Sequence, residues 1–183
     1  MSKSLTEILS QNCLFTSKRV SILHWNYIES SSDFEHSRLP NVLEILTPNV
    51  TKALPDGWQN IDSIDKAEDW ILQRKSDGDF YGLVLSDTTD IIGLLFLYPV
   101  KEAKDLVEIR LGYLLRGEVW GKGIGTELIN GLVVWARNTK LVGSIAGGVE
   151  KQNQGSIRVL EKNGFYRSNE EMPEEMYFYK VKI

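Results

Sequence analysis

The pattern of apolar and polar residues is most regular between Val107 and Ala136. In its first part, the residues that follow the period of a half-buried strand are Ile109, Leu111, Tyr113 and Leu115. In its last part, apolar residues recur at helical spacing and define one buried face: Leu128, Ile129, Leu132, Val133, Trp135 and Ala136. The glycine-rich segment 116–126 lies between the two patterns. The stretch therefore predicts a strand, a glycine loop and an amphipathic helix.

The same patterns predict elements on both sides of this stretch. Before it we expect a short helix or loose arm at 1–13, a strand at 15–23, short helices and loops at 25–53, a helix at 65–75, and a hairpin of strands 80–86 and 91–98. A connection at 101–105 leads to the strand at 106–115, the third of an antiparallel meander. Beyond it we expect a strand at 142–149, a helix at 154–163 ended by Gly164, and a hairpin of strands 165–168 and 176–182. Ser63 or Asp65 caps the helix at 65–75, and its Trp70 and Ile71 face inward.

The order of these elements predicts the α+β class, with one mixed, mostly antiparallel central sheet and helices packed on both faces. The chain has 183 residues, of which 42% are hydrophobic and 25% are charged. These values suit one compact domain over residues 1–183. No internal repeat, low-complexity tract or linker divides the sequence.

Charge and rare residues exclude several kinds of function. The net charge is −4, the sequence pI is about 5.3 and there is no basic stripe, so we expect no nucleic-acid binding. Cys13 is the single cysteine, and His24 and His36 are the two histidines, so we expect neither a disulfide framework nor a metal site. Because the N-terminal segment has no long apolar run, the sequence predicts no signal peptide, no membrane span and a cytoplasmic protein.

The segment from Trp120 to Thr126 has the composition of a phosphate-binding turn. Its glycines allow the backbone to approach a ligand closely, and its N–H groups precede a helix N-terminus, which attracts anions. Lys122 adds a positive charge. Two common phosphate motifs do not fit, since Glu118 stands where a P-loop needs lysine and Thr126 where a dinucleotide loop needs its third glycine. A tight turn without a ligand is the alternative.

Two sequence blocks extend this interpretation: WGKGIGTE at residues 120–127 and NQGSIRVLEKNGF at residues 153–165. The spacing around Gly123 and Gly125 resembles the coenzyme A pyrophosphate loop of the GNAT acetyltransferase superfamily. Together, the two blocks resemble the RimJ/RimL-type N-acetyltransferases of that superfamily. The superfamily usually has Gln or Arg at the position of Trp120, and this departure points to the RimJ/RimL-type subgroup.

The resemblance implies a binding mode for acetyl-CoA, the expected co-substrate. The GNAT-like sheet splits between the strands at 106–115 and 142–149, and coenzyme A enters this split. The residues that would hold its pyrophosphate are Trp120, Gly121, Lys122, Gly123, Ile124, Gly125 and Thr126. Those that would contact the pantetheine arm or the acetyl group are Leu114, Leu115, Asn153 and Ser156, the leucines by backbone pairing. Core packing is the alternative for the leucines, and a helix cap is the alternative for Asn153.

Two residues are candidates for catalysis. Many GNAT members have a tyrosine that acts as an acid to the leaving thiolate, but Leu160 stands at its position in this sequence. Ser156 would instead donate a hydrogen bond to the departing thiolate. A plain first-turn helix serine is the alternative. Glu108 would act as a base through water, although the subgroup usually has its acidic residue at the position of Arg110. A surface pair of Glu108 with Arg110 is the alternative, since the two share one face of a strand.

These residues predict an acetyl-CoA-dependent N-acetyltransferase that acts on a primary amine by direct attack in a ternary complex, with Cys13 idle. A protein N-terminal α-amine is the leading acceptor, and small amines and a homodimer are left open. The acidic residues between the last strands would attract a cationic amine or form a solvated loop: Glu170, Glu171, Glu174 and Glu175. The alternative function is a coenzyme A-binding regulatory or structural protein without catalysis. A nucleotide-binding module is a weaker third hypothesis.

Overall fold

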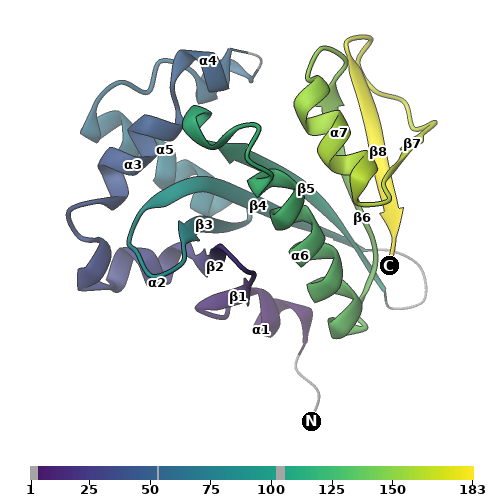
Figure 1. Ribbon diagram of the computed structural model, residues 1–183, viewed down its shortest axis with the longest axis horizontal. Coiled ribbons are helices and arrows are strands. Elements are labelled where there is room, and N and C mark those ends of the chain that lie inside the picture. The colour runs from purple at the N-terminus through teal and green to yellow at the C-terminus, as the bar shows by residue number, and fades with distance from the viewer. Residues whose placement is uncertain (1–3, 53, 102–105) are drawn as a thin grey trace. The chain divides into compact units, whose positions relative to one another are not determined.

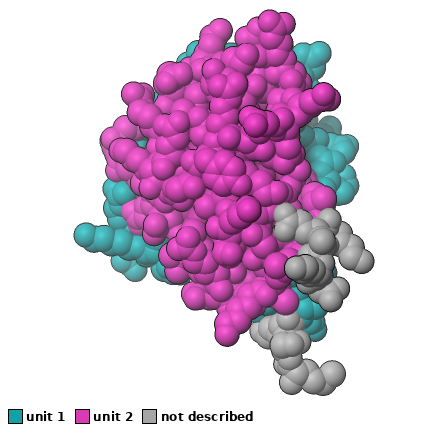
Figure 2. Space-filling view, turned by 90° about the vertical axis from the view of Figure 1, so that its right-hand side faces the viewer, with its two compact units in different colours: residues 1–96, 113–120 teal, residues 97–112, 121–183 magenta. Residues whose placement is uncertain are grey.

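The computed structural model describes residues 4–52, 54–101 and 106–183. The chain forms two compact units, coloured separately in Figure 2. Unit 1 comprises residues 1–96 and 113–120, and unit 2 comprises residues 97–112 and 121–183. Single-domain organisation over residues 1–183 stays a prediction.

The strands of the described chain belong to one mixed sheet (Figure 1). They are β1 (Cys13–Thr16), β2 (Val20–His24), β3 (Asp79–Leu85), β4 (Ile91–Lys101), β5 (Val107–Leu115), β6 (Val142–Glu150), β7 (Tyr166–Ser168) and β8 (Met176–Lys182). Their order in the sheet is β1-β2-β3-β4-β5-β6-β8-β7, and β4 and β5 each run through both units. β5 and β6 are parallel, whereas β1–β2, β2–β3, β6–β8 and β7–β8 are antiparallel. The predicted α+β class with a mixed, mostly antiparallel sheet is confirmed.

The helices agree in kind and place with the sequence pattern. They are α1 (Leu5–Leu9), α2 (Trp25–Ser30), α3 (Arg38–Ile45), α4 (Pro48–Thr51), α5 (Ile64–Asp77), α6 (Ile124–Thr139) and α7 (Gln154–Lys162). Short 3-10 turns are η1 (Ser32–Phe34), η2 (Asp56–Trp58) and η4 (Gly117–Val119). The predicted connection at 101–105 lies largely outside the described residues. None of the helices in the described ranges is long and apolar enough to span a bilayer.

One strand prediction in unit 1 is wrong. Residues 15–23 do not form a single strand, because the chain reverses between β1 and β2 and pairs Thr16 with Ser21. Ser17 closes this turn, since its backbone N–H donates to the carbonyl of Val20 at 2.8 Å and its hydroxyl donates to the same oxygen at 3.0 Å. The sequence gives little warning of the turn, because neither glycine nor proline occurs in it.

Aromatic side chains fill the core of unit 1. Phe80 stacks on Trp25 at 4.7 Å and on Phe96 at 5.1 Å between ring centroids. Trp70 meets Phe80 edge to face at 5.9 Å, an arrangement that aromatic rings favour. Trp70 lies on α5, which begins as predicted, with the Ser63 hydroxyl accepting from the N–H of Lys66. The inward orientation predicted for Trp70 is therefore confirmed.

In unit 2, the parallel ladder between β5 and β6 is short. It runs from the pair Val107↔Val142 to the pair Arg110↔Ala146. β5 continues for five residues beyond this pair and β6 for four. Directly after it, a Cβ added to Gly147 would lie 2.9 Å from the carbonyl oxygen of Leu111, so only glycine allows this close approach. The ladder between β5 and β6 thus ends at Arg110↔Ala146, and the split of the sheet for coenzyme A stays a prediction.

Candidate active site

The connection from β5 to α6 contains two glycines in the left-handed region. Gly121 has φ +72° and Gly123 has φ +80°, conformations that residues with a Cβ rarely adopt. Gly123 is the N-cap residue of α6, and its carbonyl oxygen accepts a hydrogen bond from the backbone N–H of Glu127 at 3.0 Å. The first turn of a helix leaves N–H groups without intrahelical partners, and glycine at the cap brings no side chain to cover them. The turn therefore presents backbone donors at the positive end of a 16-residue helix.

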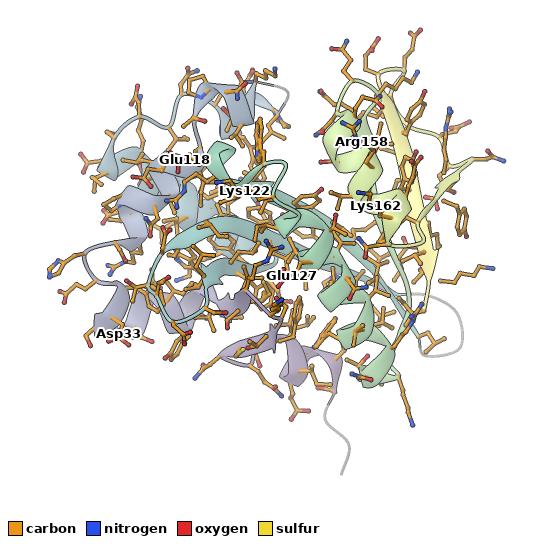
Figure 3. The ribbon with its side chains drawn as sticks, viewed as in Figure 1. Asp33, Glu118, Lys122, Glu127, Arg158 and Lys162 are labelled. Atoms are coloured by element: carbon orange, nitrogen blue, oxygen red, sulfur yellow. The ribbon has the colours of Figure 1, made fainter. Side chains whose placement is uncertain are left out.

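Lys122 and Trp120 flank the first of these glycines. Lys122 is exposed and lies ahead of α6 in Figure 3, where its charge adds to that of the helix end. The Trp120 indole N–H donates to the carbonyl of Leu115 at 2.8 Å, and 47% of the residue stays exposed. This bond ties the segment before the loop to the last residue of β5.

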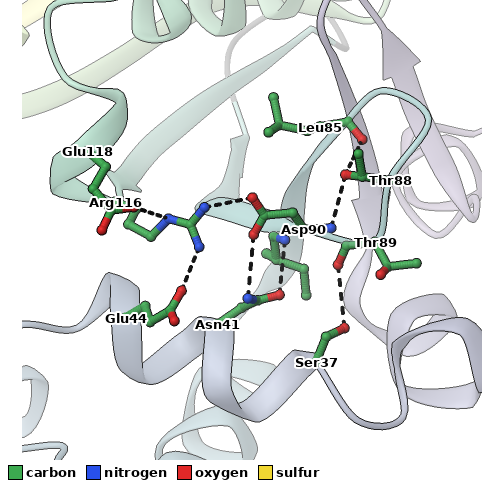
Figure 4. A network of polar contacts seen from close by, with 10 residues as sticks. Ser37, Asn41, Glu44, Leu85, Thr88, Thr89, Asp90, Arg116 and Glu118 are labelled. Atoms are coloured by element: carbon green, nitrogen blue, oxygen red, sulfur yellow. Dashed lines mark hydrogen bonds and ion pairs between the residues drawn. The ribbon is translucent and has the colours of Figure 1, made fainter.

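Arg116 fixes the start of the same connection within unit 1 (Figure 4). Its guanidinium reaches Glu44 on α3 at 2.6 Å, Asp90 at 2.7 Å and Glu118 at 3.3 Å. Its backbone N–H donates to the carbonyl of Ile92 at 2.9 Å. Burial lowers the pKa of the Arg116 guanidinium, but the bonds and charges of Asp90 and Glu44 outweigh burial and raise it above its ordinary value. The sequence pattern places residue 116 only at the start of the glycine-rich segment 116–126 and does not predict these ion pairs.

The two sequence blocks meet in unit 2. The Asn163 side chain, at the end of α7, donates to the carbonyl of Thr126 in the first turn of α6 at 3.3 Å. It also donates to the carbonyl of Val159 at 2.8 Å. This role of Asn163 is not predicted by the sequence pattern, although the residue belongs to the second block.

Asn153 caps α7, as its alternative role predicted. Its side-chain oxygen accepts the backbone N–H of Ser156 at 3.0 Å. Ser156 is therefore the third residue of a helix whose cap is another side chain, and it is half-buried. The cap fixes the backbone on which the Ser156 hydroxyl is carried.

Replacing Asn153 with Ala is expected to lower the free energy of unfolding by about 0.5–2 kcal/mol, because the first turn of α7 loses its cap. Urea denaturation of both proteins measures this difference. Asn153→Asp is the matched control and should retain most of the stability, since Asp caps as well as Asn. Equal stability of Asn153→Ala and the unchanged protein would contradict a stabilising cap.

Glu108 is a buried carboxylate with partners on three strands of unit 2. Only 3% of the residue is exposed, and Arg110 Nε lies 2.5 Å from its Oε1. Its Oε2 accepts from the Ser144 hydroxyl at 3.0 Å and from Lys180 Nζ at 2.5 Å. Burial alone would raise the pKa of Glu108, but the bonds from Lys180 and Ser144 and the charge of Arg110 outweigh it, so the pKa lies below its ordinary value. The predicted pair with Arg110 is confirmed, but it is buried at Glu108 and not a surface pair.

Arg110 extends this network toward the acidic segment. Its guanidinium lies 3.2 Å from a carboxylate oxygen of Glu170 and 4.4 Å from the ring centroid of Phe178. One member of the acidic run is thus paired within the protein.

The leucines proposed for pantetheine are both largely buried at 9% exposure, as core packing predicts, and their pairing with coenzyme A stays a prediction. Among the described residues, no three metal-binding side chains converge.

A family model described as an acetyltransferase (GNAT) domain matches residues 32–166. This chain belongs to the GNAT acetyltransferase family. The probable N-acetyltransferase YjcK of Bacillus subtilis is 32% identical to this GNAT protein over 94 residues, which cover 51% of each chain. The GNAT protein therefore spans about half the length of that curated relative.

Solved structures share the fold of this GNAT protein. One is the microcin C7 self-immunity acetyltransferase MccE in complex with acetyl-CoA and AMP, with a TM-score of 0.71, 16% identity and coverage of 96% of this chain and 99% of MccE. Another is RimL, the ribosomal L7/L12 α-N-protein acetyltransferase, in complex with coenzyme A, with a TM-score of 0.65, 15% identity and coverage of 93% and 98%. The predicted likeness to the RimJ/RimL type is thus confirmed at the level of the fold.

Proposed function

We propose that this GNAT protein transfers the acetyl group of acetyl-CoA to a primary amine. The observation that carries the proposal is the turn before α6, where Gly121 and Gly123 adopt left-handed conformations and the N-cap residue, Gly123, has no side chain to cap the helix. Such a turn suits a pyrophosphate, because backbone N–H groups and the helix dipole both favour the anion. Membership in the GNAT family and the acetyl-CoA bound to MccE support coenzyme A as this ligand.

The coenzyme would lie along one continuous stretch of chain. We assign its pyrophosphate to the backbone from Trp120 to Thr126 and to the charge of Lys122. The backbone of Leu114 and Leu115 would pair with the pantetheine arm as an added strand does.

The chemistry is a direct acyl transfer. The nitrogen lone pair of a neutral amine attacks the thioester carbonyl carbon, a C–N bond forms, the C–S bond breaks and the thiolate departs. The attacking nitrogen then gives a proton to water, and the departing thiolate takes a proton from water to become the free thiol of coenzyme A. We assign Ser156 to the departing sulfur, because its hydroxyl can donate a hydrogen bond to developing negative charge. Free thiols have a pKa of about 8.5, so coenzyme A leaves readily with modest assistance.

An α-amine suits this site better than a lysine amine. An α-amine has a pKa of about 8, so roughly a tenth of it is neutral at pH 7, whereas a lysine amine with a pKa of about 10.4 is neutral in fewer than about one molecule in a thousand. Glu108 is held ionised by its three partners and has a lowered pKa, so it is a weak base. An acceptor that is already partly neutral needs less help from a base.

The test is a screen of peptide N-termini, lysine side-chain analogues and small amines with acetyl-CoA, with release of the coenzyme A thiol as the readout. Acetylation of at least one amine, with α-amines ahead of lysine analogues, is the expected result. Coenzyme A binding without thiol release from any amine would favour a non-catalytic coenzyme A-binding protein. Tighter binding of ATP than of coenzyme A would favour a nucleotide-binding module.

Replacing Cys13 with Ala is expected to leave kcat unchanged. Cys13 is exposed on β1, with its sulfur 3.6 Å from the hydroxyl of Thr16, and direct attack needs no cysteine nucleophile. Initial-rate plots at several acetyl-CoA concentrations should intersect, as a ternary complex requires. Parallel plots, or an acetyl group trapped on Cys13, would overturn direct transfer.

A further inference from the structure

The carboxylate of Glu108 joins three neighbouring strands of unit 2. Glu108 belongs to β5, Ser144 to β6 and Lys180 to β8. In the sheet, Glu108 lies opposite Ser144, and Ala146, two residues further along β6, lies opposite both Arg110 and Lys180. Ala146 is small and fully buried, so the Lys180 side chain can pass over β6 to the Glu108 carboxylate.

This carboxylate lies directly before the end of the ladder between β5 and β6. Arg110↔Ala146 is the next pair on the same face of the sheet, and it ends the ladder. Leu111 is the residue of β5 that follows Arg110. Its carbonyl oxygen lies 2.9 Å from the position that a Cβ on Gly147 would occupy. The last ladder pairs are therefore held by side-chain bonds to Glu108 as well as by the backbone.

The same bonds make Glu108 unsuited to taking a proton. Oε1 is engaged by Arg110, and Oε2 is engaged by Ser144 and Lys180. An efficient general base needs a pKa near the working pH, whereas the pKa of Glu108 is lowered. Loss of the Glu108 charge would take from Lys180 and Arg110 a carboxylate that both of them bind, although Arg110 keeps its pair with Glu170.

We infer that Glu108 is a positioning residue that fixes β5 against β6 at the end of their ladder, and thereby the β5 backbone that would meet coenzyme A. This inference rests on the proposed function, because it assigns the coenzyme to the free end of β5. Glu108 then acts through the strand geometry and not on the amine.

The experiment uses Glu108→Gln, which keeps the shape of the side chain and removes its charge. We expect the Kd of coenzyme A, measured by calorimetry, to rise by roughly tenfold or more, since the binding strand is no longer fixed, and the acid limb of the kcat pH profile to stay in place. A general base predicts the opposite: a fall in kcat of about 10²–10⁴, an unchanged Kd and loss of the acid limb. That result would overturn the inference.

A milder variant and a matched control distinguish the loss of the Glu108 contacts from general misfolding. Ser144→Ala removes one neutral partner and keeps all charges, so it should raise the Kd in the same direction by a smaller factor. Glu68→Gln makes the same chemical change on the exposed face of α5 and should leave the Kd unchanged. An unchanged Kd in both Glu108→Gln and Ser144→Ala would also overturn the inference.

Amide hydrogen exchange separates this inference from the proposed function. Glu108→Gln should speed exchange along residues 107–112 and 142–150, and this readout needs neither coenzyme nor acceptor. If the unchanged protein fails to bind coenzyme A, the proposed function is wrong, while faster exchange in these strands still supports the fixing of β5 against β6. Unchanged exchange in a folded Glu108→Gln protein would contradict it.

Discussion

Replacing Gly123 with Asp is expected to weaken acetyl-CoA binding by roughly tenfold or more while the fold is retained. The substitution adds a Cβ and a negative charge at the N-cap of α6, where we place the pyrophosphate. Asp is among the residues that tolerate the left-handed region best, so the main effect should be repulsion of the phosphate and not loss of structure. Calorimetric titration with acetyl-CoA measures the change.

Gly164→Asp is the matched control for this prediction. Gly164 also has φ +80°, but it follows the end of α7 and has no proposed contact with the coenzyme. It should show a comparable loss of stability from backbone strain, with acetyl-CoA affinity unchanged. Equal affinity of Gly123→Asp and the unchanged protein would exclude the turn as the pyrophosphate site.

Replacing Ser156 with Ala is expected to lower kcat by about ten- to a hundredfold, at the low end of what a donor aimed at transition-state charge contributes. Coenzyme A leaves fairly well as a thiolate, so the missing hydrogen bond should cost less than in an ester or amide hydrolase. The cap of α7 stays in place in this variant, because it is the side chain of Asn153 and not that of Ser156. The measurements are kcat, the Kd of acetyl-CoA and the melting temperature.

The conservative variant Ser156→Thr keeps a hydroxyl at this position and should recover part of the lost rate. A normal kcat in Ser156→Ala together with a lowered melting temperature would make the serine structural. A raised Kd with unchanged kcat would place the hydroxyl on the bound coenzyme and not on the departing sulfur.

The elements of the fold could be predicted largely from local patterns. The helix α6 has an uninterrupted apolar face, and the glycines at its start and after α7 mark positions where φ is positive. The turn between β1 and β2 could not be predicted from the sequence. Ser17, Lys18 and Arg19 reverse the chain through hydrogen bonds of Ser17, and none of them is a typical turn-forming glycine or proline.

The candidate site was less predictable where its contacts join distant parts of the sequence. The cap by Asn153 and the pair of Glu108 with Arg110 are local, and both could be anticipated. The contact of Glu108 with Lys180 spans 72 residues and depends on β8 lying next to β6. The binding of Arg116 by three carboxylates likewise depends on tertiary packing, which no spacing rule in a single sequence encodes.

The position of β8 has a consequence for the order in which unit 2 folds during synthesis. β8 follows β7 in the chain but lies between β6 and β7 in the sheet. A nascent chain that has emerged only as far as Ser168 therefore has β7 without its partner strand and Glu108 without Lys180. Proteins emerge from the ribosome N-terminus first. Most of unit 1 can therefore fold before residues 176–182, which form β8 of unit 2, have been synthesised. Until then, the newly made β6 presents an open edge to other chains in the cell.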